Sequence, residues 1–264
     1  MKLLEKLTYK SEYFSVMHGR ELKKPNEDRL LVDEENGIFI LLDGVTRVHK
    51  EYESAPYKSS ASDICDIFID EAYRFIMDNL LDSDPERILR GAVMTANIRI
   101  REYRKKKSEN EWGFYPSAVG FLGIIRDNTL YYANAGDCMV VLIRRGAKIL
   151  LGREWTVEAV DKKQVTKAER YQIYCNHPEN HLSYTVFNGD NNVNEGLECS
   201  FVDLHEDDTV IIATDGICDY IKYEKSEDLI KQSPKQMILS SEEYDTAPYS
   251  KYADDKTLIK LKFS

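Results

Sequence analysis

Two runs of apolar residues, far apart in the sequence, share one pattern. Residues 38–42 and residues 210–213 are apolar throughout, and each run leads into an Asp-Gly pair, Asp43-Gly44 and Asp215-Gly216. Uninterrupted apolar runs are typical of strands that are buried on both faces. A charged carboxylate at the end of such a strand is unfavourable unless a cation or a hydrogen-bond donor meets it, and a glycine beside it would let the backbone turn and approach an ion. We therefore expect the two Asp-Gly pairs to meet at one cation site.

Shorter apolar runs predict the other strands, near residues 13–17, 30–32, 114–125, 130–135, 139–143, 149, 199–204 and 258–263. Turn residues at 33–37 predict a hairpin that leads into the first buried run. Glu27 and Asp28 would then lie on the strand antiparallel to the one that ends at Asp43. The closely spaced strands from residue 114 to residue 149 predict an antiparallel meander.

Apolar residues spaced three and four apart predict helices over about 59–81 and 83–107, a weakly patterned helix over 154–172, and two short helices between 217 and 243. The second helix would begin at Ser83-Asp84-Pro85-Glu86, which supplies a cap, an early proline and an acid in the first turn. It would end in the basic run 104–107, either as a solvated helix end or as a contact for phosphate. No linker interrupts the chain, so residues 1–264 are predicted to form a single α+β domain.

The charge and the cysteines of the chain argue against several classes of protein. The formal net charge is −10 over 264 residues, whereas nonspecific binding to nucleic acid or to an anionic membrane needs a basic face. No run approaches the ~20 apolar residues that span a bilayer, and the N-terminal residues do not resemble a signal peptide. The five cysteines show no C-x-x-C spacing, which favours reduced thiols in a cytoplasmic protein over a zinc ribbon or a disulfide framework.

One stretch resembles the start of a calcium-binding EF-hand loop, at residues 190–194. Glu195 stands where that loop needs glycine, and Phe201 stands where it needs a bidentate glutamate. The sequence therefore does not predict calcium binding there.

The candidate chemistry lies in carboxylates at the ends of strands and in turns: Glu27, Asp28, Asp43, Asp137, Asp215, Asp219, Asp254 and Asp255. Ligands that are all oxygen favour magnesium, manganese or calcium over zinc. Two such ions roughly 3.5–4 Å apart would share a bridging carboxylate, activate a water and clamp the oxygens of a phosphate. Read singly, each Asp-Gly is an ordinary turn; the ordered set is what predicts a metal centre.

The order of these motifs resembles that of the metal-dependent Ser/Thr protein phosphatases of type 2C, the PPM family, and in particular its divergent bacterial-type members. The matching segments are Asn26-Glu27-Asp28, Leu42-Asp43-Gly44, Asn134-Ala135-Gly136-Asp137, Thr214-Asp215-Gly216-Ile217-Cys218-Asp219 and Asp254-Asp255-Lys256-Thr257. The resemblance extends over about residues 13–263. It implies a four-layer αββα sandwich, in which two antiparallel sheets are flanked by helices.

The resemblance also implies a role for each acid. Asp43 would bridge two Mn²⁺ or Mg²⁺ ions, and the Gly44 carbonyl would ligate one of them. The other implied metal residues are Asp215 and Asp254 at the first ion, Glu27 and Asp28 at the second, and Asp137 at a third, weaker ion. A metal-bridging hydroxide would then attack phosphorus in line, without a phosphoenzyme. The implied substrate is a phosphoserine or phosphothreonine protein, with a cognate Ser/Thr kinase as the opposing enzyme.

The sequence departs from the family pattern where phosphate would be held. The family places an arginine five residues before the second acid of the early motif, and here that position is Lys23. Lysine offers a point charge instead of a planar fork, so Arg20 and Arg47 are alternatives for gripping the phosphate. His49 is either the residue that protonates the leaving group, one place beyond the usual site, or an ordinary loop histidine.

Further departures are Asp255 in place of asparagine, Pro116-Ser117-Ala118 in place of the usual Gly-Ser/Thr-Thr, and an unusual segment between Asp137 and Asp215. The changes at Lys23 and after Gly44 favour a second reading, in which the chain keeps the fold as a catalytically weak or inactive regulatory binding module. A third reading takes the acids as surface turn residues. It fits Asp43 and Asp215 poorly, since each follows an apolar run.

Overall fold

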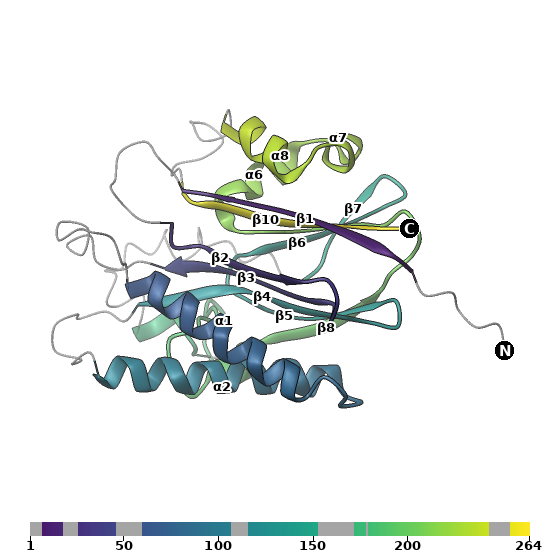
Figure 1. The fold of residues 1–264 in the computed structure, drawn as a ribbon. Coiled ribbons are helices and arrows are strands. Elements are labelled where there is room, and N and C mark those ends of the chain that lie inside the picture. Colours follow the sequence, from purple (N-terminus) through teal and green to yellow (C-terminus); the bar gives the residue numbers. More distant parts are fainter. Residues whose placement is uncertain are drawn as a thin grey trace.

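The computed structural model describes residues 7–17, 26–45, 60–106, 116–152, 172–177, 179–242 and 254–264. These residues form two five-stranded antiparallel sheets that pack face to face, with helices on both outer faces (Figure 1). The four-layer α+β sandwich expected from the sequence is therefore confirmed.

Sheet A has the strand order β1 (Tyr9–Val16), β10 (Lys256–Phe263), β9 (Thr209–Ala213), β6 (Met139–Arg144) and β7 (Ala147–Leu150). Sheet B has the order β2 (Arg29–Asp33), β3 (Ile38–Val45), β4 (Ser117–Arg126), β5 (Thr129–Ala135) and β8 (Glu198–Asp203). The predicted first strand is longer than expected and begins at Tyr9.

The helices cover the outer faces of the two sheets. Helices α1 (Ser60–Asp78) and α2 (Pro85–Lys106) lie against sheet B, whereas α6 (Cys218–Tyr223), α7 (Ser226–Lys231) and α8 (Pro234–Ser241) lie against sheet A (Figure 1). A short helix, α5 (Val193–Gly196), precedes β8. The sequence predicted two short helices between residues 217 and 243, and the structure has three, because Glu224 and Gln232 interrupt the chain in extended conformations.

Residues 38–42 of strand β3 contribute side chains to two hydrophobic cores. All five residues are fully buried. Ile38, Ile40 and Leu42 pack against α1 and α2, while Phe39 and Leu41 point into the space between the sheets. Since alternate side chains of a strand face opposite sides, a strand covered on both faces must be apolar at every position.

The expected meander over residues 114–149 is wrong in one respect. Strands β4 and β5 belong to sheet B, but β6 and β7 belong to sheet A. The chain crosses between the sheets at Gly136-Asp137, where Gly136 has φ +77° and a Cβ would stand 2.3 Å from Val119. Glycine is therefore required at this crossing, which also places Asp137 between the two sheets' edges.

Two lysines hold the helices of the sheet A side. Lys260, only 1% exposed, donates hydrogen bonds from Nζ to the carbonyls of Leu229, Ile230 and Gln232 at the end of α7. Lys148 does the same at the end of α6, with acceptors at residues 221, 222 and 224. The last carbonyls of a helix lack partners within the helix and attract cations, so each lysine joins a strand to a helix end.

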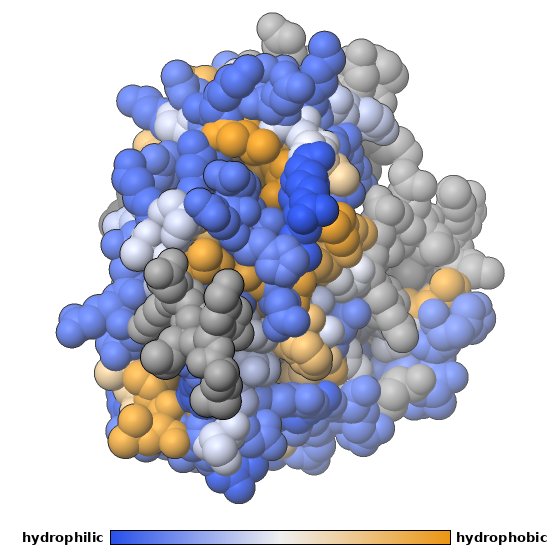
Figure 2. Space-filling model, turned by 90° about the vertical axis from the view of Figure 1, so that its right-hand side faces the viewer, coloured by the Kyte–Doolittle hydropathy of each residue, from blue (hydrophilic) through white to orange (hydrophobic). Residues whose placement is uncertain are grey.

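The end of the molecule at the right of Figure 1 has a mainly hydrophilic surface with separate, smaller hydrophobic areas (Figure 2). Within the described ranges, none of the helices has the length and apolar character needed to cross a membrane.

Candidate metal centre

The strand register brings the acidic motifs to one end of the sandwich. In sheet A, β9 ends and both β6 and β10 begin at the same edge, because Ala213 pairs with Met139 on one side and with Leu258 on the other. In sheet B, Gly44 near the end of β3 pairs with Ala118 near the start of β4. This is the edge at the left of Figure 1, where β10 begins.

The acids sit on the segments that enter or leave these strands. Asp43 lies within β3, Asp137 in the crossing between β5 and β6, and Asp215 in a 3₁₀ turn directly after β9. Asp254 and Asp255 directly precede β10. Glu27 and Asp28 were expected on a strand, but β2 begins only at Arg29, so both acids lie in the segment that leads into it.

Asp28 is held by a hydroxyl from the other sheet. Thr214 Oγ1 donates a 2.9 Å hydrogen bond to Asp28 Oδ2 and accepts one of 3.0 Å from the backbone N–H of Thr257. Asp28 is 4% exposed. Burial and the charge of Asp255 raise the pKa of Asp28 to about 7, against the hydrogen bonds from Thr257 and Thr214, which lower it. Thr214 and Thr257 lie within the matching motif segments, but the sequence pattern assigned neither of them a role.

Glu27 is joined to the terminal acidic pair through its backbone. Its N–H donates a 2.9 Å hydrogen bond to Asp255 Oδ2, and the N–H of Asp255 in turn bonds Asp254 Oδ1 at 2.8 Å. Glu27 and Asp255 are both buried. The asparagine usual at residue 255 also has an oxygen that could accept this bond; the aspartate adds a negative charge, which raises the pKa of Asp28.

Asp43, from sheet B, and Asp215, which follows a strand of sheet A, are in direct contact. Their carboxyl groups share a hydrogen bond. Burial and the charge of Asp215 raise the pKa of Asp43 well above its usual value. The pKa of Asp215 is also raised well above the usual range, by desolvation from the surrounding protein and then by Asp137 and Asp254, although part of this residue remains exposed to solvent. Two carboxyl groups in contact cannot both ionise cheaply, so one binds a proton unless a cation neutralises them.

The glycines of the two Asp-Gly pairs allow close packing between acidic segments. Strand β3 continues through Gly44 to Val45, and a Cβ on Gly44 would stand 2.8 Å from the Glu27 carbonyl oxygen. A Cβ on Gly216 would stand 2.2 Å from the carbonyl oxygen of Asp255. Each glycine therefore lets a second acidic segment lie directly against the first.

Three buried thiols surround the acids, a feature that the sequence did not reveal. Cys65, Cys138 and Cys218 come from α1, from the β5–β6 crossing and from α6, and all three are free. Burial raises the pKa of each thiol well above its ordinary value, and a nearby carboxylate, Asp43 or Asp215, raises it further. The thiols therefore stay protonated and are poor nucleophiles.

The structure does not describe the predicted phosphate-gripping residues or the candidate proton donor. Lys23, Arg20, Arg47 and His49 fall outside the described residues, as does the helix expected over 154–172, apart from residue 172.

The site's chemistry suits hard divalent cations. The donors are carboxylate oxygens and backbone carbonyls, which Mg²⁺ and Mn²⁺ prefer. Across the part of the chain that the structure describes, no three His, Cys, Asp or Glu side chains are already spaced to hold an ion. The mutual repulsion of Asp43, Asp215 and Asp28 is the physical property that a cation would relieve.

Comparison with known proteins identifies the family. The family model of protein phosphatase 2C matches residues 14–168, more than half of the chain. The chain belongs to the protein phosphatase 2C family. It is accordingly a Ser/Thr protein phosphatase by family, a class of hydrolases. The matched range contains Glu27, Asp28, Asp43 and Asp137 and ends before Asp215.

Solved structures of bacterial phosphatases share the fold of this protein phosphatase 2C member. The Mycobacterium tuberculosis Ser/Thr phosphatase PstP/Ppp aligns with a TM-score of 0.68 at 17% identity, over 96% of this chain and 98% of that one. The catalytic domain of PstP in complex with two manganese ions aligns with a TM-score of 0.64 at 16% identity, over 97% and 99%. PppA of Pseudomonas aeruginosa, described as a regulatory component of its T6SS, aligns with a TM-score of 0.63 at 18% identity, over 98% and 100%. A search of curated proteins gave no match.

Proposed function

We propose that this protein is a metal-dependent phosphatase that hydrolyses phosphoserine and phosphothreonine in proteins, with two Mn²⁺ or Mg²⁺ ions as cofactors. The observation that carries the proposal is the contact between Asp43 and Asp215, which come from different sheets and share a hydrogen bond within a buried group of acids. A phosphoprotein that a cognate Ser/Thr kinase has modified is the proposed substrate. Residues 1–264 are proposed to act as one domain, which is supported by structural matches over 96–98% of the chain.

The proposed assignment of ligands follows the family resemblance and is supported by the position of the acids at one end of the sandwich. Asp43 stands between the acids of both sheets and is the proposed bridge between two ions, with the Gly44 carbonyl beside it. Asp215 and Asp254 would complete the first ion, and Glu27, with Asp28 in support, would hold the second. Asp137, whose charge acts on both Asp43 and Asp215, is the proposed ligand of a third, weaker ion.

The protein itself would orient the acidic side chains and make catalysis depend on bound cations. Bound ions would activate the attacking water and neutralise the phosphate oxygens. Thr214 would keep Asp28 in one orientation, because its hydroxyl donates to Oδ2. The buried pair formed by Glu27 and Asp255 would hold the early and terminal acidic segments together. Without cations, the same carboxylates would repel a phosphate dianion. Catalysis in the absence of bound cations is therefore unfavourable.

The phosphate grip and the proton donor remain assigned by resemblance. We propose Lys23, Arg20 or Arg47 as the residue that binds the phosphate oxygens, and His49 as the residue that protonates the leaving oxygen. Regulatory binding without turnover is the alternative, and no feature of the described residues favours it over catalysis.

The experiment is hydrolysis of p-nitrophenyl phosphate with Mn²⁺ and with EDTA, for the wild type, Asp43→Asn and the control Asp207→Asn. Asp207 is an exposed turn residue with φ +67°, a conformation that asparagine also accepts. We expect turnover with Mn²⁺, loss with EDTA, loss in Asp43→Asn by at least 100-fold, and little change in the control. Activity that survives both chelation and Asp43→Asn would overturn the metal mechanism, and Mn²⁺ binding without turnover would favour the binding module.

A further inference from the structure

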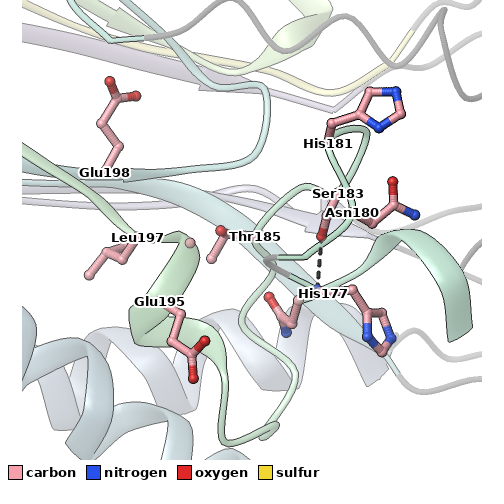
Figure 3. A pocket seen from close by; sticks show the side chains of 10 residues that line it. His177, Asn180, His181, Ser183, Thr185, Glu195, Leu197 and Glu198 are labelled. Carbon is pink, nitrogen blue, oxygen red and sulfur yellow. Dashed lines mark hydrogen bonds between the residues drawn. The ribbon is translucent and has the colours of Figure 1, made fainter.

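A groove beside the acidic centre has a distinct chemical character. It has a volume of about 270 Å³ and lies between the loop of residues 176–185 and the segment 195–198 that enters β8. His177, Asn180 and His181 project from the loop on one side, and Glu195 and Glu198 project from the other (Figure 3). We call this the side groove. Its volume is below the roughly 300–1,000 Å³ of a typical small-molecule pocket, so it suits a single side chain better than a cofactor.

The loop that forms one wall is fixed by internal hydrogen bonds. Asn176, which is buried, donates to the carbonyl of Val186 and accepts from its N–H, both at 2.9 Å. Ser183 Oγ accepts a 2.8 Å bond from the N–H of His177, seen as the dashed line in Figure 3. The wall is therefore preorganised, and a ligand would lose less free energy in ordering it.

The floor of the side groove is closed where the two walls touch. A Cβ on Gly196 would stand 2.3 Å from Thr185 Oγ1, so these two segments of the chain approach as closely as glycine allows. Thr185 is buried, while Glu195 is exposed and Glu198 is partly buried. The groove thus has a polar floor and a carboxylate towards each end of one wall (Figure 3).

Each wall of the side groove is connected by strand pairing to residues near the acidic centre. On one wall, Phe187, two residues after Thr185, pairs with Ala118, which in turn pairs with Gly44. Two strand spacings of about 4.8 Å place Phe187 about 10 Å from Gly44. On the other wall, Glu198 pairs with Asn134, whose side chain bonds the carbonyl of Cys138, next to Asp137.

The charge of the groove selects one kind of occupant. Its charged lining residues are Glu195 and Glu198, and no lysine or arginine is among the described residues that line it. The imidazoles and the amide of the opposite wall can accept or donate hydrogen bonds. A carboxylate-lined groove attracts a guanidinium or ammonium group, and it repels an acidic side chain.

We propose that the side groove binds a lysine or arginine side chain of the phosphoprotein substrate, a few residues from the phosphorylated residue. This inference rests on the proposed phosphatase function, because one wall of the groove continues to Phe187, about 10 Å from Gly44, and a few extended residues span such a distance. The side groove would make the enzyme selective for phosphorylation sites with a nearby basic residue.

The test compares two phosphothreonine peptides that differ only in arginine or alanine at flanking positions. We expect the wild type to prefer the arginine peptide in kcat/KM. The double variant Glu195→Gln/Glu198→Gln should reduce that preference about tenfold, mainly through KM, since both carboxylates that attract the basic side chain lose their charge. Glu206→Gln, an exposed acid in the β8–β9 turn outside the groove, should keep the wild-type ratio. A ratio that is the same in the wild type and the double variant would overturn the proposal.

A binding measurement tests the groove assignment independently of the proposed catalytic function. Fluorescence anisotropy with the labelled, unphosphorylated arginine peptide measures the groove without catalysis. We expect weaker binding in the double variant and at high salt, because ion pairs near the surface are screened. If the wild type hydrolyses no peptide, but binds the arginine peptide more tightly than the double variant does, the phosphatase assignment fails and the groove assignment is supported. If the double variant binds as the wild type does, the groove assignment fails.

Discussion

Thr214, at the end of a sheet A strand, donates its hydroxyl hydrogen to Asp28, at the entrance to sheet B, over 2.9 Å. The two residues are 186 positions apart in the sequence. The bond is buried and ties together the two halves of the sandwich at the edge where the acids meet. It is therefore both a structural link and a means of orienting a candidate metal ligand.

Replacing Thr214 by valine should weaken both the fold and the metal site. Valine has nearly the same shape but leaves Asp28 Oδ2 without its donor and the N–H of Thr257 without its acceptor. A buried polar group left unsatisfied costs about 1–3 kcal/mol, so we expect a loss of that size in the free energy of unfolding, measured with urea. Thr8→Val, the same change at an exposed position, serves as the control and should cost well under 1 kcal/mol. Equal losses in the two variants would contradict the role given to Thr214.

Gly216→Ala should disrupt the contact between the late Asp-Gly pair and the terminal acids. The new methyl group would meet the backbone carbonyl of Asp255 at 2.2 Å, and a backbone atom cannot move aside as a flexible side chain can. We expect a fall in Mn²⁺-dependent activity of at least tenfold, together with reduced stability.

Gly146→Ala is the matched control for Gly216→Ala. Gly146 has φ +79° with open space around its Cα, so this change costs only the backbone penalty of about 1–2 kcal/mol. Activity should remain in the control while Gly216→Ala loses it. Retention of full activity in Gly216→Ala would show that residues 254–255 need not lie where the structure places them.

Mn²⁺ should stabilise the protein through the acidic cluster. Ligands that bind only the folded state raise the melting temperature by mass action, and a cation would also relieve the repulsion among Asp43, Asp215 and Asp28. We expect Mn²⁺ to raise the Tm and EDTA to reverse the shift. Asp215→Asn should weaken Mn²⁺ binding in calorimetry, and unchanged affinity would remove this residue from the ligand set.

Lys260→Met should detach α7 from β10. The ammonium group donates to three carbonyls, and the thioether of methionine can donate to none of them. We expect a loss of about 2–4 kcal/mol in the free energy of unfolding, with Lys262→Met, on the same strand but less buried, as the milder control.

The contribution of Lys260 should also depend on pH. Burial lowers the pKa of Lys260 to about 8, from an ordinary value of 10.5. Between these two values the unfolded chain binds more protons at this residue than the folded chain does, so stability rises with pH. The difference in unfolding free energy between the wild type and Lys260→Met should therefore grow as pH increases from about 8 to 10.5. A flat difference over this range would show that the folded-state pKa is not depressed.

Substituting the candidate phosphate-gripping residues tests which side chain binds the phosphate oxygens. If Lys23, Arg20 or Arg47 binds phosphate, its replacement by alanine should raise KM for phosphate esters, because one charge-assisted contact is lost. Steady-state kinetics on p-nitrophenyl phosphate distinguishes the three residues. An unaltered KM would show that the substituted residue does not bind the phosphate.

The sequence could predict the features that depend on neighbouring residues. The run 38–42 had to be a strand covered on both faces, and the structure buries all five of its side chains completely. Helix α2 begins at Pro85, as its capping residues indicated, and the hairpin between β2 and β3 turns at Gly37 with φ +69°. These outcomes follow from backbone sterics and from the periodicity of apolar residues, both of which are local.

Other features depended on which segments pack together, and only the tertiary structure decided them. The sequence indicated that acids would gather, but the hydroxyl of Thr214, the contact of Gly216 with Asp255 and the thiols around the cluster join residues far apart in the chain. The crossing at Gly136 divides an apparent meander between two sheets. Local propensity sets the conformation of a strand, whereas its partners are set by the burial of whole faces, and that is a property of the assembled sandwich.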